Sequence, residues 1–113
     1  MKKLILLVIL SFMLVGCMEM EKKISELDLI ISKNNYIVID VRTKEEYDNG
    51  HVKGSINIPY DEITEDTELD KDKTILLYCR SGSRSSKAYT VLKEAGYDVY
   101  DMGAYQSVTL EKE

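Results

Sequence analysis

Two short apolar runs, Tyr36–Val41 and Thr74–Tyr78, constrain the fold of this chain more than any other feature. Continuous apolar runs of this length are typical of strands buried on both faces of a parallel sheet. A helical signal follows each of them. Thr43 and Glu46 have the spacing of a capping box, and the apolar residues of 85–95 repeat with helical periodicity. Strands that alternate with helices predict an α/β fold with a parallel sheet and right-handed crossovers.

Weaker signals extend this alternation along the rest of the chain. We expect helices at 24–33 and 104–110, and shorter strands at 55–58 and 97–101. The acidic segment 61–73 predicts a solvated loop with a helical turn. A chain of 113 residues fits one domain rather than two.

The N-terminus has the pattern of a lipoprotein export signal. Lys2 and Lys3 precede the apolar run Leu4–Val15, which is shorter than the roughly 20 residues that span a bilayer. Leu-Val-Gly then leads into Cys17 and resembles a bacterial lipobox, in which the cysteine is lipidated. The alternative is an uncleaved signal anchor. The predicted division is a lipoprotein signal peptide at 1–16, a lipidated cysteine and tether at 17–23, and a domain at 24–113. This predicts an extracytoplasmic protein that a lipid holds at a membrane.

The charge balance limits the possible partners. The chain has 20 acidic and 15 basic residues, for a net charge of −5. Binding to nucleic acid needs clustered Lys and Arg, so we expect no nucleic-acid partner. One histidine and one free cysteine cannot close a metal coordination shell, and we expect neither a metal nor another cofactor. Nothing demands an oligomer, and a monomer is expected.

Cys79 lies at the carboxyl end of the second apolar run, the edge where parallel sheets bind ligands. If Cys17 carries lipid, Cys79 is a lone thiol in an exported protein, which points to reactivity. A buried structural cysteine is expected inside an apolar run rather than after it.

The loop that follows Cys79 is suited to stabilise a thiolate. It consists of Arg80, Ser81, Gly82, Ser83 and Arg84. Backbone N–H groups of its small residues can turn inward around an anion, and the nearby helix N-terminus and arginines favour negative charge. We therefore predict that Cys79 is a nucleophile, because a thiol attacks as its thiolate. The only histidine, His51, lies in a glycine-flanked connection, and we favour a turn or packing role for it over acid–base catalysis.

Four segments, in this order and spacing, resemble a single-domain rhodanese. They are Asp40-Val41-Arg42, Glu45-Glu46-Tyr47, residues 50–59 (GHVKGSINIP) and residues 78–85 (YCRSGSRS). The resemblance covers about residues 24–110. It implies a parallel sheet of about five strands flanked by helices on both faces.

The resemblance also implies a chemistry. Cys79 is expected to accept a sulfane sulfur from a small anionic donor such as thiosulfate, and to pass it from a persulfide to a thiophilic acceptor such as cyanide or a thiol. The loop Arg80–Arg84 is expected to surround the sulfur, with Arg84 closing the loop and helping to bind the anion. Asp40 and Arg42 are expected to brace the fold beneath the site.

Two comparisons with the family pattern refine this expectation. Relatives that act on phosphate or arsenate have five residues between the cysteine and the arginine, whereas four separate Cys79 from Arg84, so dephosphorylation is disfavoured. The family often carries Gly-Gly and a later Trp near its C-terminus, and this chain has no Trp.

The main alternative to an enzyme is a persulfide-carrier or protein-binding module without turnover. A thiol redox sensor is disfavoured because the chain offers no resolving cysteine.

Overall fold

The computed structural model describes residues 25–113, and the chain divides into two units, Met1–Ser32 and Lys33–Glu113. The predicted signal peptide, Cys17 and the tether lie outside the described residues. Helix α2 (Glu26–Lys33) begins with the Ser25 hydroxyl accepting from the Asp28 N–H at 3.2 Å. The helix is followed by Asn34, whose left-handed φ of 51° stops the helical path. No helix within residues 25–113 has the length and apolar character to cross a membrane.

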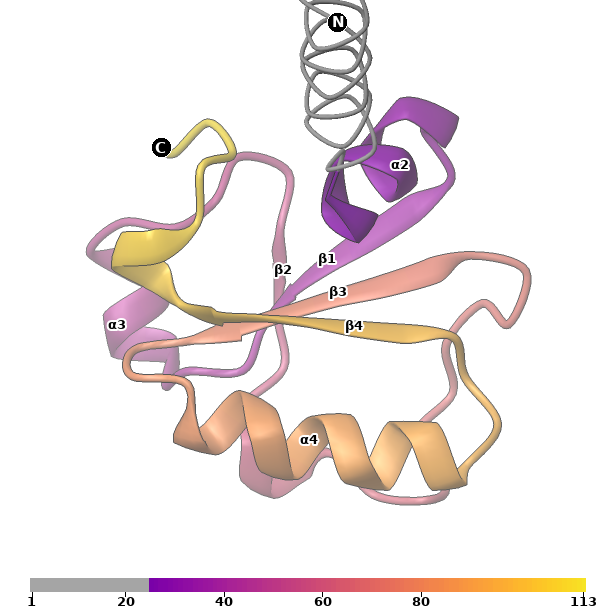
Figure 1. The fold of residues 1–113 in the computed structure, drawn as a ribbon. Helices are drawn as coiled ribbons and strands as arrows, with labels where there is room; N and C mark the ends of the chain where they lie inside the picture. The colour runs from indigo at the N-terminus through magenta and orange to yellow at the C-terminus, as the bar shows by residue number, and fades with distance from the viewer. Residues whose placement is uncertain (1–24) are drawn as a thin grey trace, which may run out of the picture. The chain divides into compact units, whose positions relative to one another are not determined.

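The unit Lys33–Glu113 contains one parallel sheet with the strand order β2-β1-β3-β4. Its strands are β1 (Tyr36–Asp40), β2 (Ile56–Asn57), β3 (Thr74–Cys79) and β4 (Val99–Ala104). The α/β class and the parallel pairing are confirmed (Figure 1). The described residues form four strands, one fewer than the predicted count of about five. Near the C-terminus, Lys112 makes only an isolated antiparallel bridge with Val52 instead of a strand.

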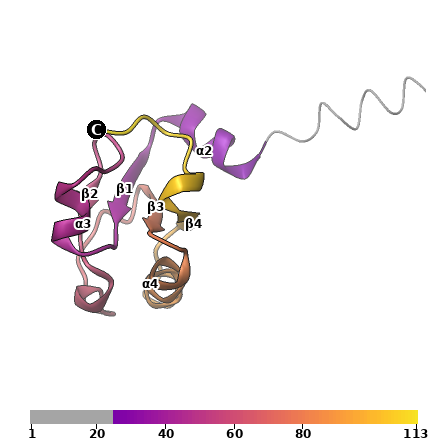
Figure 2. The same cartoon turned by 90° about the vertical axis from the view of Figure 1, so that its left-hand side faces the viewer.

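Helix α4 (Ser83–Glu94) covers one face of this sheet, as Figures 1 and 2 show. Because successive side chains of a strand alternate between faces, every second residue of β1 and β3 points toward this helix. The resulting core joins Ile39, Ile75 and Leu77 of the strands to Ala88 and Leu92 of α4. Cys79 belongs to the same set and closes the core at the carboxyl end of the sheet.

The opposite face is polar at its carboxyl end, where Asp40 and Tyr78 are fully buried. Irregular segments cover this end: Val52 and Ser55 bond to Tyr78, and the ring of Tyr105 stacks on that of Tyr78. Helix α4 thus covers one face, as predicted, whereas connecting segments and not a helix cover this end of the other face.

The short capped helix after β1 forms as predicted, but the helix expected at 104–110 does not. Helix α3 (Lys44–Asp48) begins with the predicted capping box, since Thr43 accepts from the Glu46 N–H while Glu46 accepts from that of Thr43. The predicted helix at 104–110 is only the 3-10 turn η2 (Tyr105–Ser107), and a second turn, η1 (Tyr60–Glu62), starts the acidic loop.

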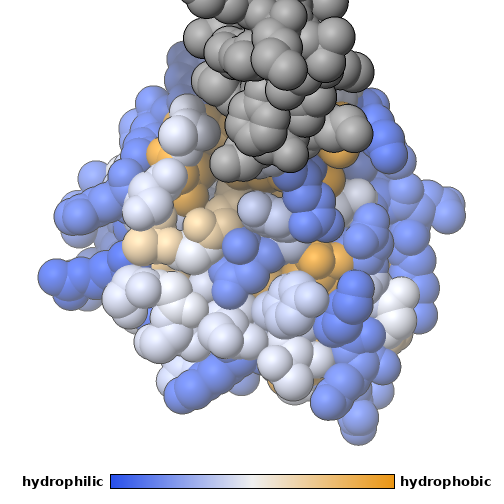
Figure 3. All heavy atoms as spheres, in the orientation of Figure 1, coloured by the Kyte–Doolittle hydropathy of each residue, from blue (hydrophilic) through white to orange (hydrophobic). Residues whose placement is uncertain are grey.

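Hydrophilic side chains line the edges of the face in Figure 3, as expected for a chain of net charge −5.

An irregularity in β4 positions the C-terminal segment. Leu77 pairs with Asp101 but Tyr78 pairs with Gly103, so Met102 is an extra residue, and Gly103 has a left-handed φ of 83°. Bulges of this kind re-aim the residues that follow them. Here the bulge precedes Tyr105, which stacks on Tyr78 with 5.7 Å between ring centroids.

Candidate active site at Cys79

Cys79 is the last residue of β3 rather than the first residue after it, and it has no exposed surface. The predicted strand 74–78 is therefore one residue too short, and Cys79 belongs to the strand instead of the loop after it. The N–H of Gly82 donates to the Cys79 Sγ at 2.9 Å, and the Ser85 Oγ lies 3.5 Å from the same sulfur. The sulfur thus occupies the centre of the turn that joins β3 to α4.

Gly82 gives this turn its shape. It is the N-cap of α4 and has a φ of 98°, a conformation that side-chain-bearing residues rarely adopt. In this conformation its N–H points back toward Cys79 while its carbonyl accepts from the Ser85 hydroxyl at 3.1 Å. Ser83 begins α4, so the helix starts two residues earlier than the predicted 85–95.

Opposing effects set the ionisation of Cys79. Burial acts to raise its pKa, but hydrogen bonds from the Ser85 side chain and from the backbone of Ser85, Gly82 and Ser81 favour the thiolate. The hydrogen bonds prevail, and the pKa of Cys79 lies below the ordinary value of a thiol. The site can therefore hold a nucleophilic sulfur without a separate general base.

Arg84 closes the turn by a contact with α3. Its Nη1 and Nη2 donate to Oε1 and Oε2 of Glu46 at 2.7 and 3.0 Å, in a bidentate ion pair. The contact with Arg84, and secondarily that with Thr43, lowers the pKa of Glu46 to about 2 against the opposing effect of burial. The guanidinium of Arg84 is thus bound to a carboxylate of its own chain. The predicted contact of Arg84 with a bound anion stays a prediction.

The remaining loop residues face outward. Arg80, Ser81 and Ser83 are exposed, whereas Ser85, which follows the predicted loop, is buried against the sulfur. The sequence pattern did not indicate that Ser85 belongs to the site. It also did not predict that Glu46 binds Arg84, because nothing in the sequence pairs residues 38 positions apart.

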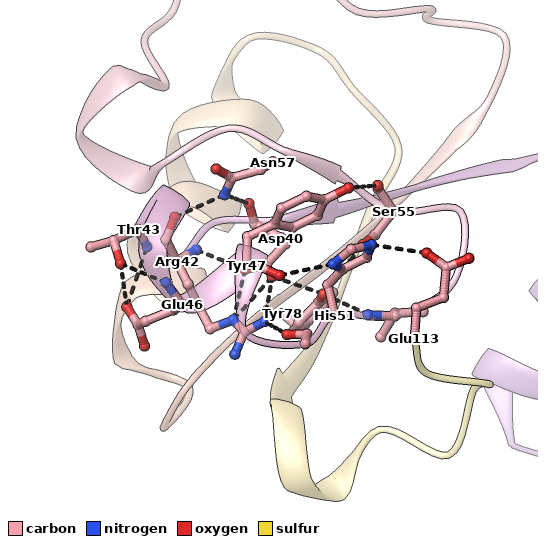
Figure 4. A network of polar contacts seen from close by, with 12 residues as sticks. Asp40, Arg42, Thr43, Glu46, Tyr47, His51, Ser55, Asn57, Tyr78 and Glu113 are labelled. Carbon is pink, nitrogen blue, oxygen red and sulfur yellow. Dashed lines mark hydrogen bonds and ion pairs between the residues drawn. The ribbon is translucent and has the colours of Figure 1, made fainter.

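Asp40 and Arg42 form a buried network beneath the site (Figure 4). Arg42 donates through Nε and Nη2 to both oxygens of Asp40, at 2.6 to 3.0 Å, and through Nη2 to the carbonyl of Gly50. The Tyr78 hydroxyl donates to Asp40 at 2.8 Å and accepts from the Val52 N–H at 3.0 Å. Burial raises the pKa of Tyr78 to about 12, so this hydroxyl keeps its proton at neutral pH. The network joins β1 and β3 to residues 50–52.

His51 is held by packing contacts. Its ring stacks on Tyr47 with 3.8 Å between centroids, and its Nδ1 lies 2.8 Å from the Tyr47 carbonyl. Its Nε2 lies 3.0 Å from Glu113, which ties the C-terminus to the 50–55 segment. Among residues 25–113, no three metal-ligating side chains of His, Cys, Asp or Glu gather in one place.

The fold and the site together define an α/β protein with a cysteine at the carboxyl edge of a parallel sheet, where hydrogen bonds stabilise its thiolate. Residues 23–109 match the family of rhodanese-like domains. The chain therefore belongs to the rhodanese-like family. Proteins similar to this chain include thiosulfate sulfurtransferases.

Two curated relatives and one solved structure illustrate the match. The chain is 38% identical over 78 residues to the thiosulfate sulfurtransferase PspE of Escherichia coli K12, covering 66% of this chain and 75% of that protein. It is 35% identical over 85 residues to thiosulfate sulfurtransferase 16, chloroplastic, of Arabidopsis thaliana, covering 62% and 68%. A structure of a rhodanese with anions from E. coli has a TM-score of 0.63 at 35% identity, covering 69% of this chain and 96% of that chain. Several other relatives are longer, and the chain spans 22–24% of their length.

Proposed function

We propose that this protein is a sulfurtransferase that moves a sulfane sulfur from an anionic donor such as thiosulfate to cyanide or a thiol. The observation that carries the proposal is the sulfur of Cys79 within hydrogen-bonding reach of the Gly82 N–H and the Ser85 hydroxyl, with a lowered pKa. The similarity to two thiosulfate sulfurtransferases supports the choice of donor.

The proposed reaction has two displacement steps at sulfur. The Cys79 thiolate attacks the outer sulfur of thiosulfate, the bond between the two donor sulfurs breaks, and sulfite leaves with the electron pair. Cys79 then carries a persulfide. An acceptor such as cyanide attacks the outer sulfur, the persulfide bond breaks, thiocyanate leaves, and the Cys79 thiolate returns.

The hydrogen-bond donors around the sulfur serve both steps. The N–H of Gly82 and the hydroxyl of Ser85 stabilise Cys79 as an attacking thiolate in the first step and as a leaving thiolate in the second. The turn of four residues between Cys79 and Arg84 leaves less room than the wider loop of phosphate- or arsenate-acting relatives.

One observation favours a second candidate, a persulfide-carrier module that acts only with a protein partner. Cys79 has no exposed surface, so a donor reaches its sulfur only when the loop Arg80–Ser83 moves. A partner that opens this loop would restrict transfer to that partner, without turnover of small molecules.

The N-terminal pattern supports a proposal on location. A lipid on Cys17 would hold the domain on the extracytoplasmic side of a membrane through the tether 17–23. Intact-mass measurement of the membrane-extracted protein tests this: a diacylated or triacylated Cys17 and loss of residues 1–16 support it, and an unprocessed N-terminus refutes it.

Mass spectrometry also tests the activity. The full chain with Cys17→Ser, in a non-ionic detergent, contains Cys79 as its sole thiol. Incubation with thiosulfate should add one sulfur to Cys79, and cyanide should remove it as thiocyanate over repeated cycles. An unmodified but intact Cys79 after incubation would refute the small-molecule enzyme and favour the carrier module.

A further inference from the structure

A cavity of about 290 Å³ lies beside the catalytic turn. Its walls come from α3 (Glu46), from the loop after Cys79 (Arg80) and from η2 (Tyr105 and Gln106), with Arg42 also lining it. We refer to this cavity as the Arg42 pocket. Neither proposed step with thiosulfate and cyanide uses it, since both reagents react at the sulfur of Cys79.

Arg42 brings an unused hydrogen-bond donor to this pocket. Its side chain is only 7% exposed, and its Nε and Nη2 are bonded to Asp40 and Gly50. The Nη1 has no hydrogen-bond partner within residues 25–113, and Figure 4 shows it turned away from the bonded nitrogens. No buried side-chain nitrogen or oxygen of the described residues is both sealed from solvent and unpartnered. The Nη1 therefore keeps an accessible surface, and Arg42 is one of the residues that line the pocket.

Among the charged side chains that line the pocket, only Arg80 has no ion-pair partner within the described residues. Asp40 balances Arg42, and Arg84 balances Glu46 in a bidentate pair. Arg80 makes no ion pair within the described part of the chain and is exposed. This local excess stands out in a protein of net charge −5 and favours an anionic ligand.

Two residues that line the pocket lie next to Cys79 or to its partner in the sheet. Arg80 directly follows Cys79, and Tyr105 directly follows Ala104, which is paired with Cys79 in the sheet register. A ligand in the pocket thus lies next to the turn that holds the sulfur. The ring of Tyr105 stacks over the Arg42 guanidinium at 4.3 Å and gives the pocket an aromatic wall.

We infer that the Arg42 pocket binds the carboxylate of a small organic thiol that accepts sulfur from Cys79, an inference that rests on the proposed sulfurtransferase function. The guanidinium groups of Arg42 and Arg80 and the amide of Gln106 are suitable donors to a carboxylate. The volume suits a ligand of a few carbon atoms, since pockets for drug-sized ligands begin at about 300 Å³.

Such a thiol accepts the sulfur in a single displacement step. The acceptor thiolate attacks the outer sulfur of the Cys79 persulfide, a new sulfur–sulfur bond forms, and the bond to the Cys79 Sγ breaks. The acceptor leaves as its own persulfide and Cys79 keeps the electron pair as a thiolate.

The test compares two acceptors that differ only at the far end, 3-mercaptopropionate and 3-mercapto-1-propanol, with thiosulfate as donor. The full chain carrying Cys17→Ser should favour the carboxylate by about tenfold in kcat/KM at equal thiolate concentration, the effect of one charge-assisted contact. Arg80→Gln and Gln106→Glu should each reduce this ratio to below about threefold, because they remove a cation or add an anion at the pocket. Lys93→Gln, which removes a cation from exposed helix surface outside the pocket, should keep the full ratio.

The ratio separates this inference from the proposed function. Normal turnover with cyanide but a ratio near one in the parent protein would overturn the inference and leave the sulfurtransferase standing. A ratio that falls as much in Lys93→Gln as in Gln106→Glu would also overturn it.

A binding measurement decides the inference even if no sulfur is loaded. In the Cys79→Ser variant of the same protein, labelled with nitrogen-15, 3-mercaptopropionate should shift the side-chain signals of Gln106 and Arg80 in a saturable way. The propanol analogue should not. Absence of a saturable shift with the carboxylate would overturn the pocket assignment, whatever the fate of the sulfurtransferase proposal.

Discussion

Removal of the Ser85 hydroxyl is the most direct test of how this site stabilises a thiolate. The Ser85 Oγ lies 3.5 Å from the Cys79 Sγ and also donates to the Gly82 carbonyl at 3.1 Å. Its single proton can serve only one of these acceptors at a time. When Cys79 ionises, the hydroxyl must turn from Gly82 to the sulfur, and the neutral hydrogen bond is lost.

The size of the effect follows from this exchange. A hydrogen bond to a charged group contributes about 1.5–3 kcal/mol and a neutral one about 0.5–1.5 kcal/mol. The difference is about 1–1.5 kcal/mol, which corresponds to roughly one pKa unit. Ser85→Ala should therefore raise the pKa of Cys79 by about one unit, and lower the thiolate fraction at a pH below that pKa by about tenfold.

The assay is a pH titration of thiolate absorbance in the full chain with Cys17→Ser, where Cys79 is the sole thiol. Ser86→Ala is the matched control, because Ser86 is the exposed neighbour of Ser85 and makes no contact with the sulfur among the described hydrogen bonds. The rate of sulfur loading from thiosulfate should fall in parallel with the thiolate fraction. An unchanged pKa in Ser85→Ala, or an equal shift in Ser86→Ala, would refute the role of this hydroxyl.

Four further predictions follow from the site and its supports. Cys79→Ser should abolish sulfur transfer and keep the circular dichroism and unfolding midpoint of a folded domain; an unfolded variant would contradict a catalytic role. Gly82→Ala should cost about 1–2 kcal/mol in urea unfolding because of the left-handed φ, and slow sulfur loading. Tyr78→Phe should destabilise by about 1–3 kcal/mol, since Asp40 loses a buried donor; a neutral change would argue against the network. Because the pKa of Glu46 is lowered to about 2, its contribution to stability is complete above its ordinary value of 4.5 and is lost as pH falls toward 2, and unfolding of Glu46→Gln should show a flatter dependence in this range.

The sequence predicted the class of fold and the position of Cys79 at the carboxyl edge of the sheet. The apolar runs at 36–41 and 74–78 and the capping box at Thr43 are local patterns, and each appears in the structure within a residue or two. Local patterns suffice here because hydrophobic periodicity and capping depend on neighbours along the chain. The placement of Cys79 at the carboxyl edge follows from the same alternation of strand and helix.

Contacts between distant segments were beyond the reach of these patterns. Nothing local indicates that Glu46 engages Arg84, that Ser85 faces the sulfur, or that the Met102 bulge brings Tyr105 over Arg42. Each depends on the three-dimensional register of elements far apart in the chain. The sequence thus sufficed to identify Cys79 and the loop after it as the candidate site. Only the packing of α3, α4 and the C-terminal segment at one edge of the sheet decided which charges are paired, because ion pairing depends on distance in space and not on spacing in the chain.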